Sequence, residues 1–184
     1  FQTNTAQAHR LYTIVLAYAD LNGEEIVWDL YAGTGTISLF LAQKAGFVYA
    51  LELIKSAVKD GIENARIHGI ENIKFIEGDI LENVNNIEQK AEVVVVDPPR
   101  SGIHPKVCLF LTKCGAERII YVSCNPTTMA RDIEFLASKI RRHVVPEIEL
   151  ARKFDGDLEM KTWIDRVRTE SRHEQTKAKT AKER

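Results

Sequence analysis

The sequence predicts an α/β fold built on an open, doubly wound and mostly parallel sheet. Short runs of Val and Ile alternate with segments of helical length, and polar residues gather where the apolar runs end. Strands that are apolar throughout are typical of a parallel sheet with helices on both faces. Ligands of such sheets bind beyond the carboxyl ends of the strands, so we expect a functional site at that edge.

The first half of the chain contains a leading helix, three strands and two further helices. The leading helix begins near residues 3–5, where Thr and Asn side chains can cap it, and runs to about Leu21. Short runs rich in β-branched and aromatic residues predict strands at 24–31, 47–53 and 72–79. Helical spacing closed by a glycine predicts helices at 36–46 and 54–69.

The second half continues the alternation and then changes in composition. Strands are predicted at 92–99 and 118–124, and helices at 104–115 and 127–139, the last one capped by Thr127 or Thr128. Residues 1–150 are therefore expected to form one domain. Residues 151–184 are expected to be a partly disordered extension, because apolar residues almost vanish after Arg166. The alternative for this extension is a weak contact with RNA phosphates.

Composition excludes several classes of protein. The 184 residues carry a net charge of −1, so the domain as a whole has no basic field that would attract nucleic acid. Three cysteines without a C-x-x-C pair argue against a disulfide framework or a closed zinc site, and they fit a reducing cytoplasm. No apolar run approaches the roughly 20 residues of a membrane helix. The chain begins with Phe1 rather than Met, as expected of a fragment of a longer protein.

A glycine loop and two acids predict a nucleoside-containing cofactor. Gly33 and Gly35 lie between a strand and a helix, where they allow a tight turn close to a ligand, but the full G-x-G-x-x-G pattern is absent. Glu52 follows about 20 residues later, where a ribose-binding acid is found in nucleotide folds. Asp79, after the third strand, is placed to bind an adenine amino group. This set favours S-adenosylmethionine (SAM) over NAD, while the alternative is that both acids only cap strand ends.

Two further motifs, DPPR at 97–100 and SCNP at 123–126, end consecutive predicted strands and should therefore lie close together. The two prolines make the first turn stiff. Arg100 stands where the similar loop of amino-group methyltransferases has an aromatic residue, which weakens that interpretation. A thiolate at Cys124 could add to C6 of uracil and make C5 nucleophilic. The alternative is that Cys124 is a small hydrophobe, as we expect for Cys108 and Cys114.

Five segments together resemble a known family, the SAM-dependent RNA (uracil-5-)-methyltransferases that make 5-methyluridine in 23S rRNA and tRNA. The segments run in order through residues 1–137: FQTNTAQAHRLY, WDLYAGTGTISLFLA, ALELIKSAVKDGIENARIHGIENIKFIEGD, VVVVDPPRSGI and YVSCNPTTMARDIEFL. The rRNA branch is the closer match, through FQTNTAQ and DLYAGTGT. The resemblance implies a Rossmann-like methyltransferase fold, SAM as cofactor, RNA as partner, a cytoplasmic location and a monomer.

The resemblance also implies a role for each candidate residue. Cys124 is the nucleophile, and Arg100 holds a uracil that has left its stack. Glu52 binds the ribose, Asp79 lies near the adenine, and Asp97 lies between the cofactor and the target base. The implied cofactor-binding residues are Gln2, Tyr31, Gly33, Gly35, Glu52, Asp79 and Asp97, and no metal is expected.

The sequence departs from the family in two respects. The family's His-x-Glu motif, which supplies the general base, is not found after Ser138, so Glu147, Glu149 and Glu159 are candidates by charge only. The family's upstream RNA-binding β-barrel and Cys-rich iron–sulfur segment have no counterpart in this sequence. Two alternatives therefore stay open beside RNA methylation: a SAM-dependent enzyme of another substrate class, and a domain that binds SAM without turnover.

Overall fold

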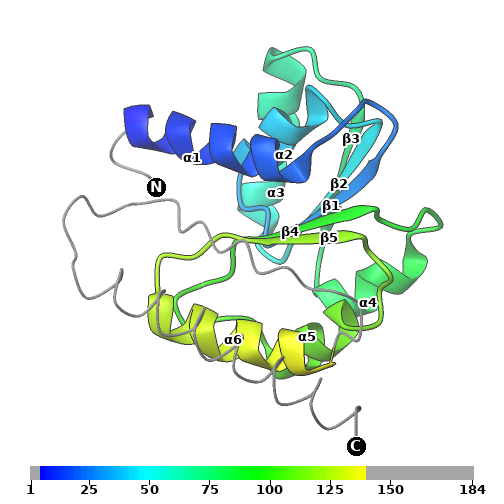
Figure 1. The fold of residues 1–184 in the computed structure, drawn as a ribbon. Coiled ribbons are helices and arrows are strands. Elements are labelled where there is room, and N and C mark those ends of the chain that lie inside the picture. Colours follow the sequence, from blue (N-terminus) through cyan, green and yellow to red (C-terminus); the bar gives the residue numbers. More distant parts are fainter. Residues whose placement is uncertain (1–4, 140–184) are drawn as a thin grey trace, which may run out of the picture. The chain divides into compact units, whose positions relative to one another are not determined.

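The computed structural model describes residues 5–139 (Figure 1). Predictions that concern Gln2, the three C-terminal glutamates, the domain boundary near residue 150 and the 151–184 extension lie outside the described residues and stay predictions.

A five-stranded sheet forms the centre of the described region. Its strands are β1 (Ile26–Leu30), β2 (Phe47–Glu52), β3 (Ile73–Glu77), β4 (Val93–Val96) and β5 (Arg118–Tyr121). All neighbouring strands are parallel, in the order β3-β2-β1-β4-β5. The predicted parallel sheet is thus confirmed. The strand order changes direction between β1 and β4, which is the position where open α/β sheets bind ligands.

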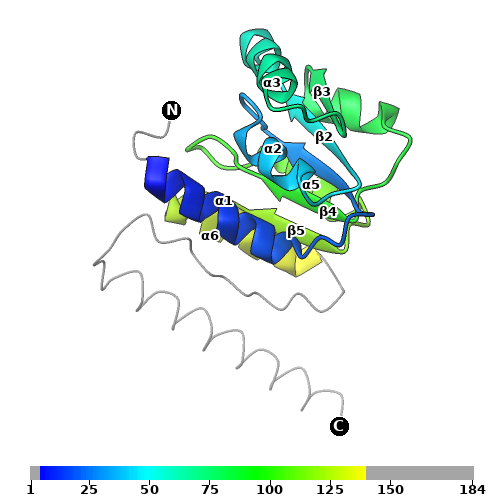
Figure 2. The same cartoon turned by 90° about the horizontal axis from the view of Figure 1, so that it is seen from above.

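Helices cover both faces of the sheet (Figures 1 and 2). One face carries α1 (Thr5–Ala19), α2 (Thr36–Ala42) and α3 (Lys55–Ile67). The other carries α4 (Ile80–Asn83), the 3₁₀ turn η1 (Val84–Asn86), α5 (Pro105–Leu111) and α6 (Pro126–Lys139). The sequence analysis did not anticipate α4 and η1, because a helix of one turn carries too few residues for a periodic pattern.

Two hydrophobic cores follow from the alternation of side chains along the strands. The core under α1 and α2 takes its strand residues from one set of alternate positions, Val27, Val48, Val93 and Val95. The core under α4, α5 and α6 takes the other set, Trp28, Leu30, Leu51, Val94 and Val96. Because β1 and β4 are buried on both faces, their sequences are apolar almost without interruption.

The start of α6 differs from the prediction by one residue. The helix begins at Pro126, and the side-chain oxygen of Asn125 accepts the Thr127 N–H at 3.1 Å, so Asn125 rather than Thr127 or Thr128 caps it. Proline suits a first helical position, because its missing N–H would have no partner there. The cap ties α6 directly to the turn that contains Cys124.

Candidate functional site

The candidate residues gather at the carboxyl edge of the sheet. Leu30 pairs in register with Leu51 and Val96, and Val96 with Tyr121, so β1, β2, β4 and β5 end at about the same level. The predicted site residues within the described range lie at this edge: Glu52 is the last residue of β2, and the turns after β1, β3, β4 and β5 contain Tyr31, Gly33, Gly35, Asp79, Asp97, Arg100 and Cys124.

The glycine loop curls over the end of β2. The N–H groups of Tyr31 and Ala32 both donate to Leu51 O, at 3.1 and 3.0 Å. Gly33 and Gly35 have φ of 57° and 78°, and a Cβ on Gly35 would overlap the Phe75 ring. A Cβ on Gly33 would meet nothing within 4 Å, so the outer side of the loop is open. The loop therefore offers space for a ligand where the sequence predicted it.

Glu52 fixes this loop while part of its carboxylate stays accessible. Oε2 accepts the Gly33 N–H at 2.9 Å, and Oε1 accepts the Ile54 N–H at 2.8 Å. The side chain is half-buried. Each carboxylate oxygen has a second lone pair, so the residue can close the loop and still accept from two hydroxyls. Glu52 thus has the capping role that the sequence offered as an alternative, and this role does not exclude ribose binding.

Asp79 has a capping role too, and an apolar pair lies near it. Asp79 Oδ1 accepts the N–H groups of Leu81 and Glu82 at the start of α4. The Gly78 N–H donates to Glu52 O at 3.0 Å, which joins this turn to the end of β2. Leu53 and Ile54, directly after Glu52, are 65% and 55% exposed. The sequence analysis missed them, although two apolar residues after a strand-end acid were a usable signal.

A buried acid lies beneath the loop. Asp29 on β1 is 1% exposed, and Ser38 on α2 donates its hydroxyl to Oδ2 at 2.5 Å. Burial raises the pKa of Asp29 to about 7; the Ser38 hydrogen bond opposes this shift, and the charges of Asp97 and Glu52 add to it. Asp29 was not among the residues predicted from the sequence, because burial cannot be read from a single acidic residue in a strand.

The DPPR and SCNP turns are in contact, as predicted. Asn125 Nδ2 donates to Arg100 O at 2.9 Å, and Thr128 Oγ1 donates to the same oxygen at 3.3 Å. Ser123 Oγ accepts the Asn125 N–H at 2.9 Å, which closes a tight turn around Cys124. Cys124 and Arg100 are both exposed. Cys124 is therefore not a buried hydrophobe at a strand end.

The other two thiols are packed. Cys108 is buried and Cys114 is half-buried, and burial raises the pKa of both, that of Cys108 to about 11. The prediction that they are core residues is confirmed for Cys108 and holds in part for Cys114. A thiol with a raised pKa is a poor nucleophile at neutral pH.

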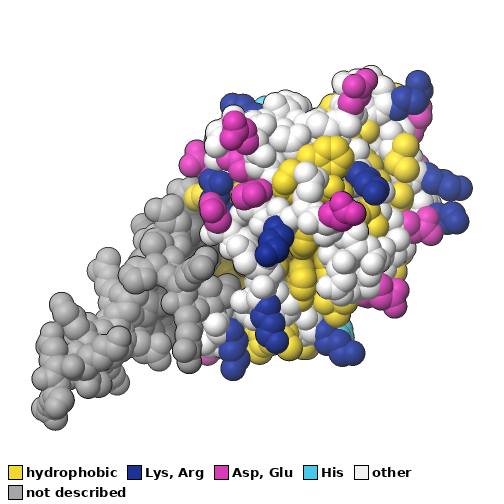
Figure 3. Space-filling view, turned by 90° about the vertical axis from the view of Figure 1, so that its right-hand side faces the viewer, with side chains coloured by type: hydrophobic (Ala, Val, Ile, Leu, Met, Phe, Trp, Pro, Cys, Tyr) yellow, Lys and Arg dark blue, Asp and Glu magenta, His cyan; other side chains and the backbone are white. Residues whose placement is uncertain are grey.

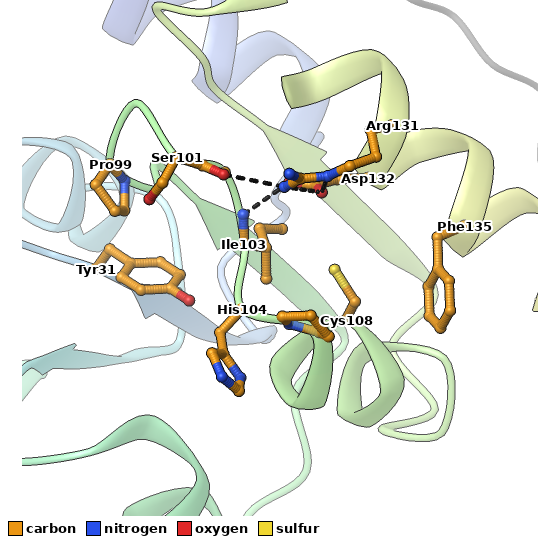
Figure 4. Close-up of a pocket in the computed structure, with 11 residues that line it drawn as sticks. Tyr31, Pro99, Ser101, Ile103, His104, Cys108, Arg131, Asp132 and Phe135 are labelled. Atoms are coloured by element: carbon orange, nitrogen blue, oxygen red, sulfur yellow. Dashed lines mark hydrogen bonds and ion pairs between the residues drawn. The ribbon is translucent and has the colours of Figure 1, made fainter. Parts of the chain in front are cut away.

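A cavity of about 470 Å³ lies on the α5–α6 side of the DPPR turn (Figure 4). The ring of Tyr31 lines it together with His104, Cys108 and Phe135. Burial raises the pKa of the Tyr31 hydroxyl, and a hydrogen bond to the His104 backbone lowers it. Since the ring faces this cavity, the part of Tyr31 that belongs to the glycine loop is its backbone, with φ of 69°.

The described residues offer no sign of a metal site or of a membrane span. Within 5–139, no group of three or more His, Cys, Asp and Glu side chains is arranged to hold a metal ion. None of the helices in that range is both long and apolar enough to cross a membrane.

Comparison with known proteins places the chain in a family. The sequence model described as tRNA (Uracil-5-)-methyltransferase matches residues 1–164. An uncharacterised RNA methyltransferase of Caldanaerobacter subterraneus subsp. tengcongensis is 47% identical over 139 residues, 74% of this chain and 31% of the relative. A second one, of Clostridium tetani, is 45% identical over 139 residues, 74% of this chain and 30% of the relative.

A solved structure agrees with these relatives. The Pyrococcus abyssi tRNA (uracil-54, C5)-methyltransferase in complex with S-adenosyl-L-homocysteine superposes with a TM-score of 0.64 at 32% identity, over 73% of this chain and 33% of that one. The chain thus spans about a third of the length of these proteins. The family resemblance read from the sequence is confirmed, and the chain belongs to the tRNA (uracil-5-)-methyltransferase family.

Proposed function

We propose that this protein transfers a methyl group from SAM to C5 of a uridine in RNA, through a covalent bond between Cys124 and C6 of the base. One observation carries the proposal: Cys124 is exposed on a turn that is hydrogen-bonded to the DPPR loop at the end of the neighbouring strand. Membership of a uracil-5-methyltransferase family supports the same chemistry.

The residues at the carboxyl edge fit SAM. The glycine loop is open on its outer side at Gly33, and Glu52 keeps free lone pairs for ribose hydroxyls. Leu53 and Ile54 offer an exposed apolar surface that suits the face of an adenine, and Asp79 can accept from its amino group while it caps α4. The related Pyrococcus abyssi enzyme, which binds S-adenosyl-L-homocysteine, supports this choice. SAM supplies an electrophilic methyl group on a sulfonium.

The chain's own residues supply the nucleophile and the orientation. The Cys124 thiolate forms a bond to C6, and the C5–C6 electron pair moves onto C5. C5 then accepts the methyl group, and the electrons of the broken sulfur–methyl bond stay on the departing sulfur. A base removes the C5 proton, and the released pair reforms the double bond as the Cys124–C6 bond breaks. Arg100, exposed on the loop that is hydrogen-bonded to the Cys124 turn, holds the extruded uracil.

The preferred substrate in our proposal is 23S rRNA. The segments FQTNTAQ and DLYAGTGT resemble the rRNA branch of the family. The solved relative acts on tRNA by its name, so tRNA is the competing substrate. Transcripts of both kinds, offered in the same assay, distinguish the two.

A covalent trap tests the mechanism. The chain is mixed with SAM and RNA that contains 5-fluorouridine, and a denaturation-resistant protein–RNA adduct is sought by electrophoresis and mass spectrometry. The last step removes a proton from C5. In 5-fluorouridine a fluorine replaces that hydrogen and cannot be removed by a base, so the adduct accumulates after methyl transfer. We expect an adduct from the wild type and from Cys114→Ala, and none from Cys124→Ala. Methyl transfer that survives Cys124→Ala would instead indicate a SAM-dependent enzyme of another class.

A further inference from the structure

A buried carboxylate on α6 is hydrogen-bonded to the loop that continues from Arg100 and to the last residue of β5, the strand that leads to Cys124. Asp132 is 3% exposed. Its Oδ2 accepts the Ile103 N–H at 2.7 Å and the Tyr121 hydroxyl at 2.8 Å. Its Oδ1 accepts Nε and Nη2 of Arg131 at 2.9 and 2.7 Å. The bonds to Ile103 and Arg131 lie between the DPPR turn and α6 (Figure 4).

The partners of Asp132 lead directly to the candidate site. Ile103 lies in the loop that continues from Arg100, and Tyr121 is the last residue of β5, in the segment that leads to Cys124. Arg131 also donates from Nη2 to Ser101 O at 3.0 Å, so the same helix holds the loop at a second point. The loop after β4 and the last residue of β5 are therefore bonded to one carboxylate.

The loop passes close to this carboxylate at Gly102. Gly102 has φ of 83°, and its N–H donates to Pro99 O at 2.8 Å, which closes the turn. A Cβ on Gly102 would overlap Arg131 Nη2 and lie 2.5 Å from Asp132 Oδ2. A side chain at this position would therefore overlap the Arg131–Asp132 pair and would have to adopt a positive φ, so glycine suits the close passage of the backbone.

The buried charge of Asp132 is expected to contribute little to the stability of the fold. The desolvation of a buried ion pair offsets much of its attraction, and apolar replacements of similar volume are often as stable. Four charge-assisted hydrogen bonds do, however, fix distances closely. The pKa of the Tyr121 hydroxyl is raised, first by burial and second by the hydrogen bond to Asp132.

We propose that Asp132 is a positioning residue that sets where Cys124 lies relative to the DPPR loop. The proposal rests on the proposed function. Asp132 does not touch the base or the cofactor in this scheme; it acts through Ile103 and Tyr121. Loss of its geometry should therefore slow covalent attack and leave the cofactor end of the site, at Glu52 and the glycine loop, unchanged.

The test compares Asp132→Asn with Glu134→Gln, which removes a charge from an exposed position of the same helix. At saturating 5-fluorouridine RNA and SAM, we expect the rate of adduct formation to fall about tenfold or more in Asp132→Asn, as displacement of a reacting group by about 1 Å can cause. The Kd for SAM should change less than about twofold, and Glu134→Gln should behave as wild type. Tyr121→Phe, which keeps the Ile103 bond, should show a smaller loss and serves if Asp132→Asn does not fold.

Two results would overturn the proposal. One is an adduct rate in Asp132→Asn or Tyr121→Phe that equals that of the wild type. The other is a parallel loss of melting temperature, SAM affinity and rate, which marks a merely structural role. If the wild type forms no adduct, it is the proposed function that fails. In that case amide hydrogen exchange tests the role of Asp132 separately. Faster exchange in Asp132→Asn at 100–104, the loop after β4, but not at 31–36, the glycine loop, supports positioning, and unchanged exchange refutes it.

Discussion

At the scale of single residues, the strand-end acids have structural roles that leave room for the binding roles proposed for them. Glu52 accepts two backbone N–H groups and Asp79 caps a helix, yet both retain unused acceptor capacity. Because one carboxylate can serve both purposes, a sequence pattern alone could not choose between a cap and a ligand contact. The choice requires a measurement that separates stability from affinity.

The substitution Glu52→Gln provides that measurement. Replacing one carboxylate oxygen by an amide removes an acceptor from the Gly33 or Ile54 N–H and from the ribose hydroxyls. We expect SAM affinity to fall about tenfold or more, and the free energy of unfolding to fall by about 1–2 kcal/mol. Calorimetric titration with SAM and urea unfolding give the two quantities.

Glu77→Gln is the matched control for Glu52→Gln. Glu77 on β3 is the residue that pairs in register with Glu52. It is exposed, and its carboxylate forms an ion pair with Lys55 at 3.9 Å. The same change of charge one strand away should leave SAM affinity unaltered. Equal effects of the two substitutions would contradict a direct role of Glu52 in ribose binding.

At the scale of elements, one buried hydrogen bond joins β1 to α2 across the glycine loop. Asp29 and Ser38 lie on either side of that loop, and both are buried. Asp29 is flanked by the carboxylates of Asp97, after β4, and Glu52, at the end of β2, which disfavour a third negative charge. This end of the sheet therefore has a pH-dependent stability.

The sign of that dependence follows from the pKa of Asp29, which is raised from 3.8 to about 7 in the folded protein. Above about pH 4 the unfolded chain loses the proton while the folded protein keeps it, so stability falls as the pH rises and levels off beyond the folded pKa. Between about pH 5 and about pH 8, the wild type should lose roughly 3 kcal/mol more than Asp29→Asn.

Urea unfolding of both proteins across this range checks the prediction, because the difference between them cancels every other titrating group. Identical pH profiles would show that Asp29 is ionised in the folded protein. Ser38→Ala is a useful third protein. It removes the hydrogen-bond donor that favours the charged form of Asp29, so the pKa of Asp29 should rise further. The loss of stability with rising pH should then continue to a higher pH than in the wild type.

At the scale of the whole molecule, charge distribution bears on how RNA is bound. The chain has 25 basic and 26 acidic residues. On the face shown in Figure 3, Lys and Arg side chains are interspersed with Asp and Glu around apolar surface. Affinity for RNA rises with the number of phosphates that basic groups neutralise, so a nearly neutral chain gains little from this source.

We therefore expect this chain by itself to bind RNA weakly, with a Kd no tighter than about 10 µM at roughly 0.15 M salt. Fluorescence anisotropy with labelled 23S rRNA and tRNA fragments over a series of salt concentrations measures it. Nanomolar binding with a steep salt dependence would show that a basic surface on this chain suffices. Since the chain spans about a third of its relatives, a longer protein that includes the remaining length is the natural comparison.

The sequence by itself determined the class of fold and predicted the edge of the sheet at which the candidate site lies. Val- and Ile-rich strands buried on both faces can hardly form anything but a helix-covered parallel sheet, and the rule for such sheets placed the ligand edge at Gly33, Glu52 and Cys124. The reaction was indicated by the resemblance of five segments to the RNA (uracil-5-)-methyltransferases, which implies that Cys124 is the nucleophile.

Only the tertiary structure decided which side chains are exposed and which groups meet across the sheet. The exposure of Cys124, the exposure of the apolar pair after Glu52 and the raised pKa of Asp29 depend on burial, which residues distant in sequence create together. Asp132 is the clearest case. In the sequence it is one acid in a polar helix, and its importance comes from Ile103 and Tyr121, which the chain brings to it only when β4, β5 and α6 pack.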